Sequence, residues 1–330
     1  MKAAIVGIAG ATLAEAEAAL FRAHRPAGVI LFARNIVDPT QLRALTAALR
    51  AVLPSHAVLM VDQEGGRVAR LRPPHWLAHP AAAAIGVIFA ANATAGLRTA
   101  WLTGGLIGLE CADTGFDVVC APVLDLRLPD TNAAIGDRAY AEDPVAVAGL
   151  GRAMAGGLLA AGVQPVGKHA PGHGRARVDS HLAMPVVEAG DHDADLLPFR
   201  RNSDLPWLMT AHIRYPAWDA DRPATFSARV IEKIIRENIG FRGVLVSDDL
   251  AMHALTGSPA ERAQRALAAG CDFALYCPGD RDGTAAVLAA CPPVTPAASA
   301  RLAAAKGLAQ HRRLALDPPA LRLERDGLLG

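Results

Sequence analysis

Short apolar runs recur along the chain and alternate with longer amphipathic stretches. The runs are nearly continuous in hydrophobicity, which is typical of strands buried on both faces of a parallel sheet. Eight strands are predicted, over 3–8, 28–32, 57–62, 116–121, 163–168, 207–212, 243–248 and 271–276. Strands buried on both faces must be covered by helices, so the pattern predicts an α/β fold.

The stretches between these runs have the periodicity and end signals of helices. Helices are predicted over 13–25, 40–53, 93–111, 144–161, 228–238 and 259–269. Their predicted starts are hydroxyl residues, which can accept a hydrogen bond from a free amide of the first turn: Thr40, Ser227 and Ser258. Their predicted ends are Gly162, Gly240 and Gly270. Only the fifth unit, around 191–202, has a weak helical pattern.

Eight strands that alternate with helices predict a (β/α)8 barrel of the TIM type. The chain has 330 residues, and such a barrel typically needs ~250 residues plus insertions. A single catalytic domain over 1–330 is therefore expected. A doubly wound sheet is the main alternative, but no Gly-x-Gly-x-x-Gly run follows the first strand.

Polar and charged residues gather where the predicted strands end. In a barrel these carboxyl ends meet at one rim, where the active sites of this fold lie. The strand-end residues are Arg34, Asn35, Asp62, Gln63, Glu64, Asp125, Lys168, His169, His212, Asp248 and Asp249. Ionisable groups at so many separate strand ends favour a functional site over a solvated surface, whose charges would scatter further into the loops.

Composition argues against several classes of partner. With 33 basic and 32 acidic residues the net charge is +1, so nucleic acid and anionic membranes are not expected partners. No apolar run approaches the ~20 residues of a membrane span. The first ten residues faintly resemble a signal peptide, but Gly7 and Gly10 interrupt them and Glu15 and Glu17 follow. The odd number of cysteines, five, and their lack of Cys-x-x-Cys spacing predict buried free thiols in a cytoplasmic protein.

The segment 62–70 has the composition of a polar binding loop. Asp62 can accept hydrogen bonds from the hydroxyls of a ligand, and Arg67 and Arg70 can hold acceptor groups. Gly65 and Gly66 allow a tight turn or a close approach of the backbone to a ligand. A local Asp–Arg ion pair beside a tight turn explains the same residues, and the spacing leaves both interpretations open.

The segment 167–181 brings three histidines, a lysine and a carboxylate onto one predicted loop. One interpretation is a metal site made by His169, His173, Asp179 and His181. The other is a movable loop that carries an acid/base pair, Asp179 and His181. The neighbouring Lys168 argues against a cation, and the glycines and proline suit a movable loop with few apolar anchors, so acid/base chemistry is favoured.

The spacing of Asp179 and His181 supports this choice. Side chains separated by one residue in an extended loop point the same way, so the carboxylate can orient the imidazole. An imidazole with a pKa near ~6.5 can both donate and accept a proton at neutral pH.

The predicted seventh barrel strand ends in a pair of carboxylates. Neighbouring residues on a strand face opposite sides, so only one of the two is expected at the centre of the rim. We assign that place to Asp248 and expect Asp249 to hold the following loop.

Arg138 lies in a loop that follows the fourth predicted strand. It is expected either to close over the site or to form a loop ion pair with Asp137 or Glu142. Composition alone leaves both open.

Together these segments resemble glycoside hydrolase family 3, and within it the β-N-acetylhexosaminidase branch. The similarity runs in order through 28–35, 62–70, 121–125, 136–138, 168–181, 209–212 and 247–250. Its most specific part is the Lys-His-x-Pro-Gly-His-Gly run with Asp-Ser-His downstream. Ala170 is a departure, since the family usually has a bulky aromatic residue there.

The resemblance implies a single-domain barrel that removes a non-reducing terminal β-linked N-acetylglucosamine (GlcNAc). It implies Asp248 as the nucleophile and His181, assisted by Asp179, as the acid/base. The positions implied to bind the sugar are Asp62, Arg70, Arg138, Lys168 and His169. The implied substrates are peptidoglycan fragments recycled in the cytosol, GlcNAc-1,6-anhydro-N-acetylmuramic acid with or without peptide. No cofactor or metal is implied, and a monomer is expected.

Three kinds of alternative remain open from the sequence: another family 3 activity, a metal-dependent hydrolase and an inactive barrel. A family 3 phosphorylase would use phosphate in place of water, and a β-glucosidase would take another sugar. A metal-dependent hydrolase would use the loop with His169, His173 and His181. A catalytically inactive sugar-binding barrel is the third, although the presence of Asp248 and the 179–181 run argues against it.

Overall fold

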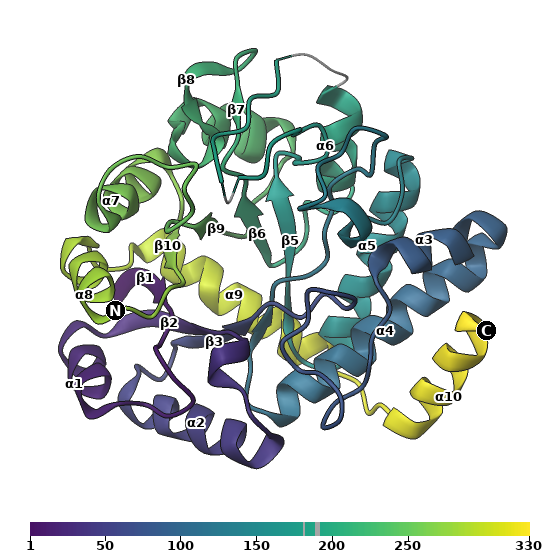
Figure 1. The fold of residues 1–330 in the computed structure, drawn as a ribbon, viewed down its shortest axis with the longest axis horizontal. Helices are drawn as coiled ribbons and strands as arrows, with labels where there is room; N and C mark the ends of the chain where they lie inside the picture. The colour runs from purple at the N-terminus through teal and green to yellow at the C-terminus, as the bar shows by residue number, and fades with distance from the viewer. Residues whose placement is uncertain (181, 189–191) are drawn as a thin grey trace.

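The computed structural model describes residues 1–180, 182–188 and 192–330. Within these residues eight parallel strands close into a barrel, in the order β1-β2-β3-β4-β5-β6-β9-β10 and back to β1 (Figure 1). Their bounds are Lys2–Val6, Pro26–Leu31, Val58–Val61, Val118–Val119, Gln164–Ala170, Trp207–Thr210, Val244–Asp249 and Phe273–Tyr276. Each predicted strand overlaps one barrel strand, so the predicted fold class is confirmed.

Helices surround the barrel (Figure 1). They are α1 (Glu15–His24), α2 (Pro39–Val52), α3 (Ala82–Ala91), α4 (Ala93–Asp113), α5 (Pro144–Ala160), α6 (His192–Arg200), a π-helix (Val230–Asn238), α7 (Pro259–Ala269), α8 (Arg281–Ala290), α9 (Pro296–Arg312) and α10 (Pro318–Leu329). The prediction missed α3, α8, α9 and α10. None of the helices in the described part of the chain is long and apolar enough to cross a membrane.

The predicted helix ends are partly correct. Ser258 caps α7, and Gly270 ends it in the left-handed conformation with φ 116°. The prediction for α2 is wrong by two residues, because the cap is Asp38, whose carboxylate accepts hydrogen bonds from the amides of Thr40 and Gln41. A carboxylate at this position satisfies first-turn amides as a hydroxyl would.

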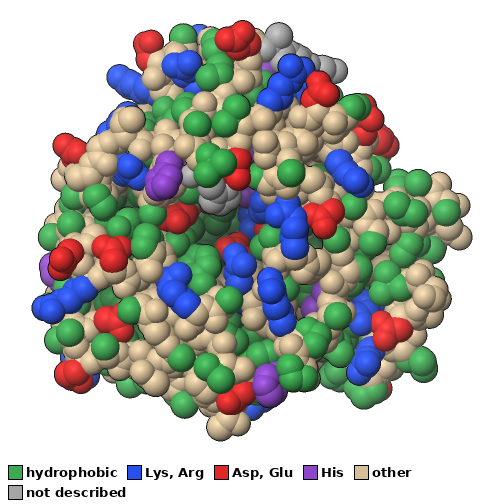
Figure 2. Space-filling model, viewed as in Figure 1, with side chains coloured by type: hydrophobic (Ala, Val, Ile, Leu, Met, Phe, Trp, Pro, Cys, Tyr) green, Lys and Arg blue, Asp and Glu red, His purple; other side chains and the backbone are tan. Residues whose placement is uncertain are grey.

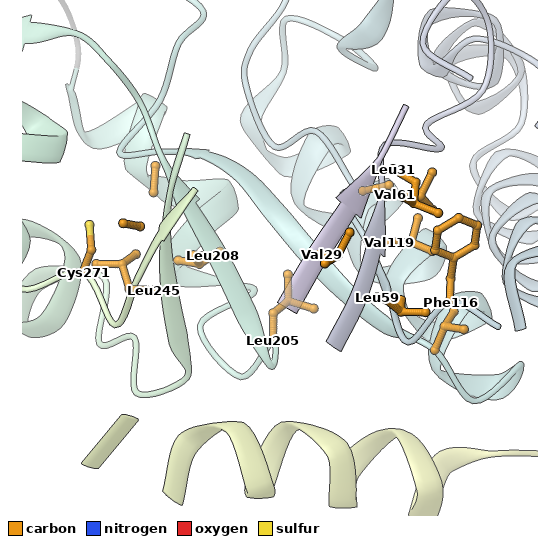
Figure 3. Packing of buried hydrophobic residues seen from close by; sticks show 14 of the residues in the cluster. Val29, Leu31, Leu59, Val61, Phe116, Val119, Leu205, Leu208, Leu245 and Cys271 are labelled. Atoms are coloured by element: carbon orange, nitrogen blue, oxygen red, sulfur yellow. The ribbon is translucent and has the colours of Figure 1, made fainter. Parts of the chain in front are cut away.

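The barrel strands contribute apolar side chains to two layers, one outside the barrel and one inside it. On β2, Val29 and Leu31 point outward to the helices, whereas Ile30 points into the barrel. Figure 3 shows part of the outer layer, with Val29 and Leu31 beside Leu59 and Val61 of β3. The inner layer continues into α9 through Ala298, Leu302 and Ala305. Helix α9 therefore closes the amino-terminal end of the barrel with apolar side chains and leaves the carboxyl-terminal end as the open rim.

A small antiparallel hairpin, β7 (Arg214–Tyr215) with β8 (Asp219–Pro223), was also missed by the prediction. It shares an apolar cluster with the long segment that follows β5, through Ala176 and Val187. The hydroxyl of Tyr215 donates a hydrogen bond to the carbonyl of Gly172. The expectation that this segment has few apolar anchors is therefore wrong for the part up to Ala176.

The cysteines agree with the prediction. All five are buried and free within the described residues. Burial raises the pKa of the Cys120 and Cys277 thiols, which lie near the rim, well above the ordinary value, so both are neutral thiols.

Candidate active site

The carboxyl ends of the strands border a cavity of about 400 Å³. Figure 2 shows this face hollowed near its centre, with basic and acidic side chains gathered around the hollow. The predicted site residues that line the cavity are Asp62, Arg70, Arg138, Lys168, His169, Asp179 and Asp248. His181 lies outside the described residues. The structure thus brings together every predicted site residue that it describes.

A buried ion-pair network forms one wall of the cavity. Lys168, at the end of β5 and only 2% exposed, places its Nζ 2.8 Å from Asp62 Oδ1 and 2.6 Å from Glu64 Oε1. Arg138 donates two hydrogen bonds of 2.8 Å to Glu64. Arg138 thus borders the site, and its carboxylate partner is Glu64 rather than the expected Asp137 or Glu142. Charges buried in this way are stable only when each has close partners, so the network holds all four side chains in place.

The network also sets the ionisation of its members. Burial by itself would raise the pKa of Glu64, but Arg138 and Lys168 outweigh it and lower the pKa to about 2. The pKa of Asp62 is likewise lowered, because Lys168 and Arg70 outweigh the effect of burial. Burial opposes the charge on Lys168, but Asp62 and Glu64 raise its pKa above the ordinary value. At neutral pH this wall presents fixed charges and no titrating group.

The loop after β3 contains both a local ion pair and an arginine that lies at the cavity. Arg67 donates to Asp137 Oδ1 at 2.8 Å and to the carbonyl of Ala134 at 2.9 Å, so it forms a local ion pair. Arg70 lies against the cavity, with its Nη2 3.5 Å from Asp62 Oδ2 and its guanidinium 5.4 Å from the centre of the Phe32 ring. The tight turn is also present, with Gly65 at φ 98°.

Asp248 and Asp249 end β9, and both border the cavity. Asp249 Oδ1 accepts hydrogen bonds of 3.0 Å from the amides of Ala251 and Cys277, so this carboxylate holds the loop. Asp248 Oδ1 accepts the amide of Asp249 at 2.8 Å, which orients the Asp248 carboxylate. The loop-holding role expected of Asp249 is therefore confirmed, and the expectation that only Asp248 lies at the centre of the rim stays a prediction.

Asp248 is held in its ionised form. Burial would raise its pKa, but interactions with His169, His212 and the amide of Asp249 lower it below the ordinary value. For Asp249 burial dominates, and the pKa is raised. Of the two carboxyl groups, that of Asp248 therefore ionises more readily.

His212 contacts the end of the strand that carries Asp248. Its Nδ1 lies 2.7 Å from the hydroxyl of Thr225, and its Nε2 lies 2.9 Å from the carbonyl of Asp249. Burial lowers the pKa of this imidazole, so it is neutral at pH 7. Both ring nitrogens have protein partners, so His212 links Thr225 to the backbone at the end of β9.

Asp125, in the segment that follows β4, contacts His169 and His173 of the loop after β5. Its Oδ2 lies 2.7 Å from His169 Nδ1, and its Oδ1 accepts the amide of His173 at 2.7 Å. The remaining nitrogen of His169, Nε2, is 3.4 Å from Arg138 Nη2 at the cavity. A carboxylate on Nδ1 fixes the orientation of an imidazole and leaves Nε2 for a ligand.

The described histidines of this loop, which the sequence left open as metal ligands, have protein partners in the structure. His169 uses Nδ1 for Asp125, and His173 places Nε2 3.2 Å from the hydroxyl of Ser180. Over residues 1–180, 182–188 and 192–330 no three His, Cys, Asp or Glu side chains lie close enough together to hold a metal ion. The described histidines are therefore organised by protein contacts.

Two residues of the site, Glu64 and Asp125, were noted at strand ends but given no role. Their partners are distant in sequence, 74 residues between Glu64 and Arg138 and 44 between Asp125 and His169. Their place at strand ends was a usable signal, but only the closed barrel shows which charge each one meets.

The sequence matches a known protein family over most of its length. Residues 3–292 match the profile described as the glycosyl hydrolase family 3 N-terminal domain. The chain belongs to glycosyl hydrolase family 3. The predicted resemblance is thereby confirmed, and with it an enzyme of the glycoside hydrolase class.

Relatives within the family agree with the predicted branch. The chain is 40% identical over 280 residues to a protein named beta-hexosaminidase from Nitrosomonas eutropha, covering 83% of this chain and 80% of that protein. It is 41% identical over 327 residues to a beta-hexosaminidase from Pseudomonas aeruginosa, covering 97% and 89%. The crystal structure of NagZ from Neisseria gonorrhoeae with N-trifluoroacetyl-D-glucosamine superposes with a TM-score of 0.88 at 33% identity, over 100% of this chain and 98% of that one.

Proposed function

We propose that this protein is a retaining exo-β-N-acetylglucosaminidase that removes the non-reducing terminal GlcNAc from peptidoglycan fragments. The proposed substrates are GlcNAc-1,6-anhydro-N-acetylmuramic acid with or without its peptide. The observation that carries the proposal is Asp248, an oriented and ionised carboxylate in a cavity that is also lined by a network of hydrogen-bonding charges. Similarity to beta-hexosaminidases, and to a protein crystallised with an N-acylated glucosamine, supports the choice of sugar.

In the first step the Asp248 carboxylate attacks the anomeric carbon, and the bond to the leaving oxygen breaks. His181, assisted by Asp179, donates a proton to that oxygen, so the aglycone leaves as a neutral alcohol. A covalent glycosyl-aspartate remains. Asp248 suits this role because its lowered pKa keeps it unprotonated at neutral pH.

In the second step a water molecule replaces the aspartate. His181 takes a proton from the water while the oxygen attacks the anomeric carbon, and the Asp248 carboxylate leaves. Two displacements at one carbon retain its configuration. Asp62, Arg70, Arg138, Lys168 and His169 would hold the hydroxyl and acetamido groups of the sugar during both steps. The scheme needs no cofactor or metal.

The decisive experiment measures turnover of a chromogenic β-N-acetylglucosaminide and of the matching β-glucoside, each with and without phosphate. The proposal expects the N-acetylglucosaminide to be cleaved faster, with no acceleration by phosphate and free β-GlcNAc as the first product seen by NMR. Formation of GlcNAc-1-phosphate would identify a phosphorylase, and preference for the glucoside would contradict the proposed sugar.

We also propose that the enzyme acts as a monomer in the cytoplasm, where five free thiols remain reduced. Size-exclusion chromatography with light scattering and cell fractionation test these two points separately from the catalytic proposal.

A further inference from the structure

His173 connects the two ends of the segment that carries Asp179. Its ring is 3% exposed, and its Nε2 lies 3.2 Å from the hydroxyl of Ser180, which is also 3% exposed. Seven residues separate the two along the chain. Between them Arg177 and Val178 face solvent, so the hydrogen bond ties the base of an outward turn.

The first end of this turn is anchored from the barrel. Asp125, whose side chain is fully buried, accepts the amide of His173 at 2.7 Å. The same carboxylate holds the ring of His169 at the cavity. Because one buried group contacts both, the position of His173 is coupled to the position of a predicted sugar-binding residue.

The middle of the turn is anchored separately. The hydroxyl of Thr131 donates to the carbonyl of Gly174 at 2.7 Å, and Asn132 Nδ2 donates to the carbonyl of Arg177 at 2.9 Å. Ala176 is fully buried in the cluster shared with the hairpin. At the last part of the turn the carbonyl of Ser180 accepts the amide of Ala254 at 3.3 Å, and the contact between His173 and the Ser180 hydroxyl adds a side-chain anchor there.

Asp179 directly precedes Ser180 and lines the cavity. The carbonyl of Asp179 accepts the amides of Leu182 at 2.9 Å and Ala183 at 3.0 Å, so Asp179 begins the turn that contains Ser180. A Ser180 side chain that is held on His173 therefore fixes this turn and, with it, the place of Asp179 at the cavity. The second histidine of the Lys-His-x-Pro-Gly-His-Gly run is thus placed to set the direction of the acid/base carboxylate.

We propose that His173 is a positioning residue: by hydrogen bonding to Ser180, with Asp125 as its anchor, it holds Asp179 at the cavity for acid/base catalysis. This inference rests on the proposed function. It assigns His173 neither proton transfer in the reaction nor a metal. Burial lowers the pKa of His173 to about 4, which agrees with a neutral ring at the pH where the enzyme would work.

The test compares variants of the full-length protein on two substrates that differ in their need for an acid. One is the disaccharide GlcNAc-1,6-anhydro-N-acetylmuramic acid, a poor leaving group, and the other is 2,4-dinitrophenyl β-N-acetylglucosaminide, a good one. The quantity of interest is the ratio of single-turnover glycosylation rates, disaccharide over aryl glycoside. Asp179→Ala is measured first and should lower this ratio.

Ser180→Ala should lower the same ratio by about tenfold, the size expected when one buried hydrogen bond is lost. The KM for the aryl substrate should stay within about twofold, because the sugar-binding wall is untouched. Ser180→Thr should restore the ratio, since it keeps the hydroxyl. Ser258→Ala, which removes a hydroxyl from the exposed cap of α7, is the matched control and should leave the ratio unchanged.

His173→Gln, which keeps a hydrogen-bonding group near the position of Nε2, is the second variant if Ser180→Ala lowers the melting temperature. It should retain more of the ratio than His173→Leu. An unchanged ratio in Ser180→Ala, with a reduced ratio in Asp179→Ala, would overturn the inference and leave the proposed function standing. An unchanged ratio in Asp179→Ala would overturn both.

Discussion

The two ends of the barrel are built from the same eight strands but have opposite chemistry. At the carboxyl ends, Asp62, Lys168 and Asp248 border an open cavity in a network of ion pairs and hydrogen bonds. At the amino ends, Leu302 and its neighbours on α9 close the barrel with apolar contacts. The carboxyl end therefore contains the buried charges that form the site, whereas the amino end is filled with apolar side chains.

This difference separates function from stability in one fold. Buried charges contribute little net stability even when they are paired, whereas apolar burial stabilises the folded chain directly. Substitutions at the two ends should therefore affect different measurements. Changes at the two ends are expected to differ in size as well, with the largest effect on turnover and the smallest on the pH dependence of stability.

Asp248→Ala should abolish turnover and leave the fold intact. Loss of the nucleophile is expected to lower kcat on the order of 10³-fold or more. The measurement is kcat on a chromogenic β-N-acetylglucosaminide, with circular dichroism and the melting temperature as the check on folding. Turnover near the wild-type rate in a folded Asp248→Ala protein would remove Asp248 from the mechanism.

His181→Ala should slow cleavage of the disaccharide far more than formation of the glycosyl-enzyme from a dinitrophenyl glycoside. A sugar alcohol needs a proton to leave and a dinitrophenolate does not, and general acid catalysis typically contributes about 10²–10⁴-fold. The second step needs the base, so the aryl substrate should show a burst followed by slow turnover. Asp179→Ala should show a milder form of the same pattern.

Pre-steady-state rates on both substrates check this prediction. A role for His181 as a metal ligand would instead give equal losses on all substrates, with partial recovery on addition of Zn²⁺. Equal losses for good and poor leaving groups would contradict the acid/base role even if Asp248 is confirmed as the nucleophile.

Leu302→Ala, at the opposite end, should lower the free energy of unfolding by about 2–4 kcal/mol, because it leaves a cavity where α9 meets the barrel interior. Its kcat and KM should equal those of the wild type at a temperature where both are folded. Urea denaturation and steady-state kinetics measure the two effects. A clear change in KM would show that the two ends are coupled.

The smallest effect concerns pH. The folded-state pKa of His173 is about 4, below the ~6.5 of an unfolded histidine. Between these values the unfolded chain binds more protons, so stability rises with pH and is lost as pH falls. The contribution of His173 is about 2 kcal/mol between pH 7 and pH 5. Urea denaturation at both pH values should give a smaller difference for His173→Gln than for the wild type, and equal differences would contradict the neutral buried state.

Prediction from the sequence worked best where the signal is local. Continuous apolar runs predicted every barrel strand, and five of the polar residues at the ends of those runs line the cavity, namely Asp62, Lys168, His169, Asp248 and Asp249. It failed where the pattern is weak or partners are distant. The prediction missed α9, whose Ala-rich sequence gives few contrasts, and left the partner of Arg138 open because Glu64 lies 74 residues away.

The sequence by itself determined the alternation of strands and helices, the charged residues at the strand ends and the family, because burial on two faces and short motifs are written into consecutive residues. Only the tertiary structure decided which charges meet. Lys168 reaches Asp62 across 106 residues of chain, and Asp125 meets His169 across 44. The physical reason is closure of the barrel, which sets strands that are distant in sequence beside one another and so decides which carboxylates are paired, which histidines are held neutral and which aspartate stays ionised.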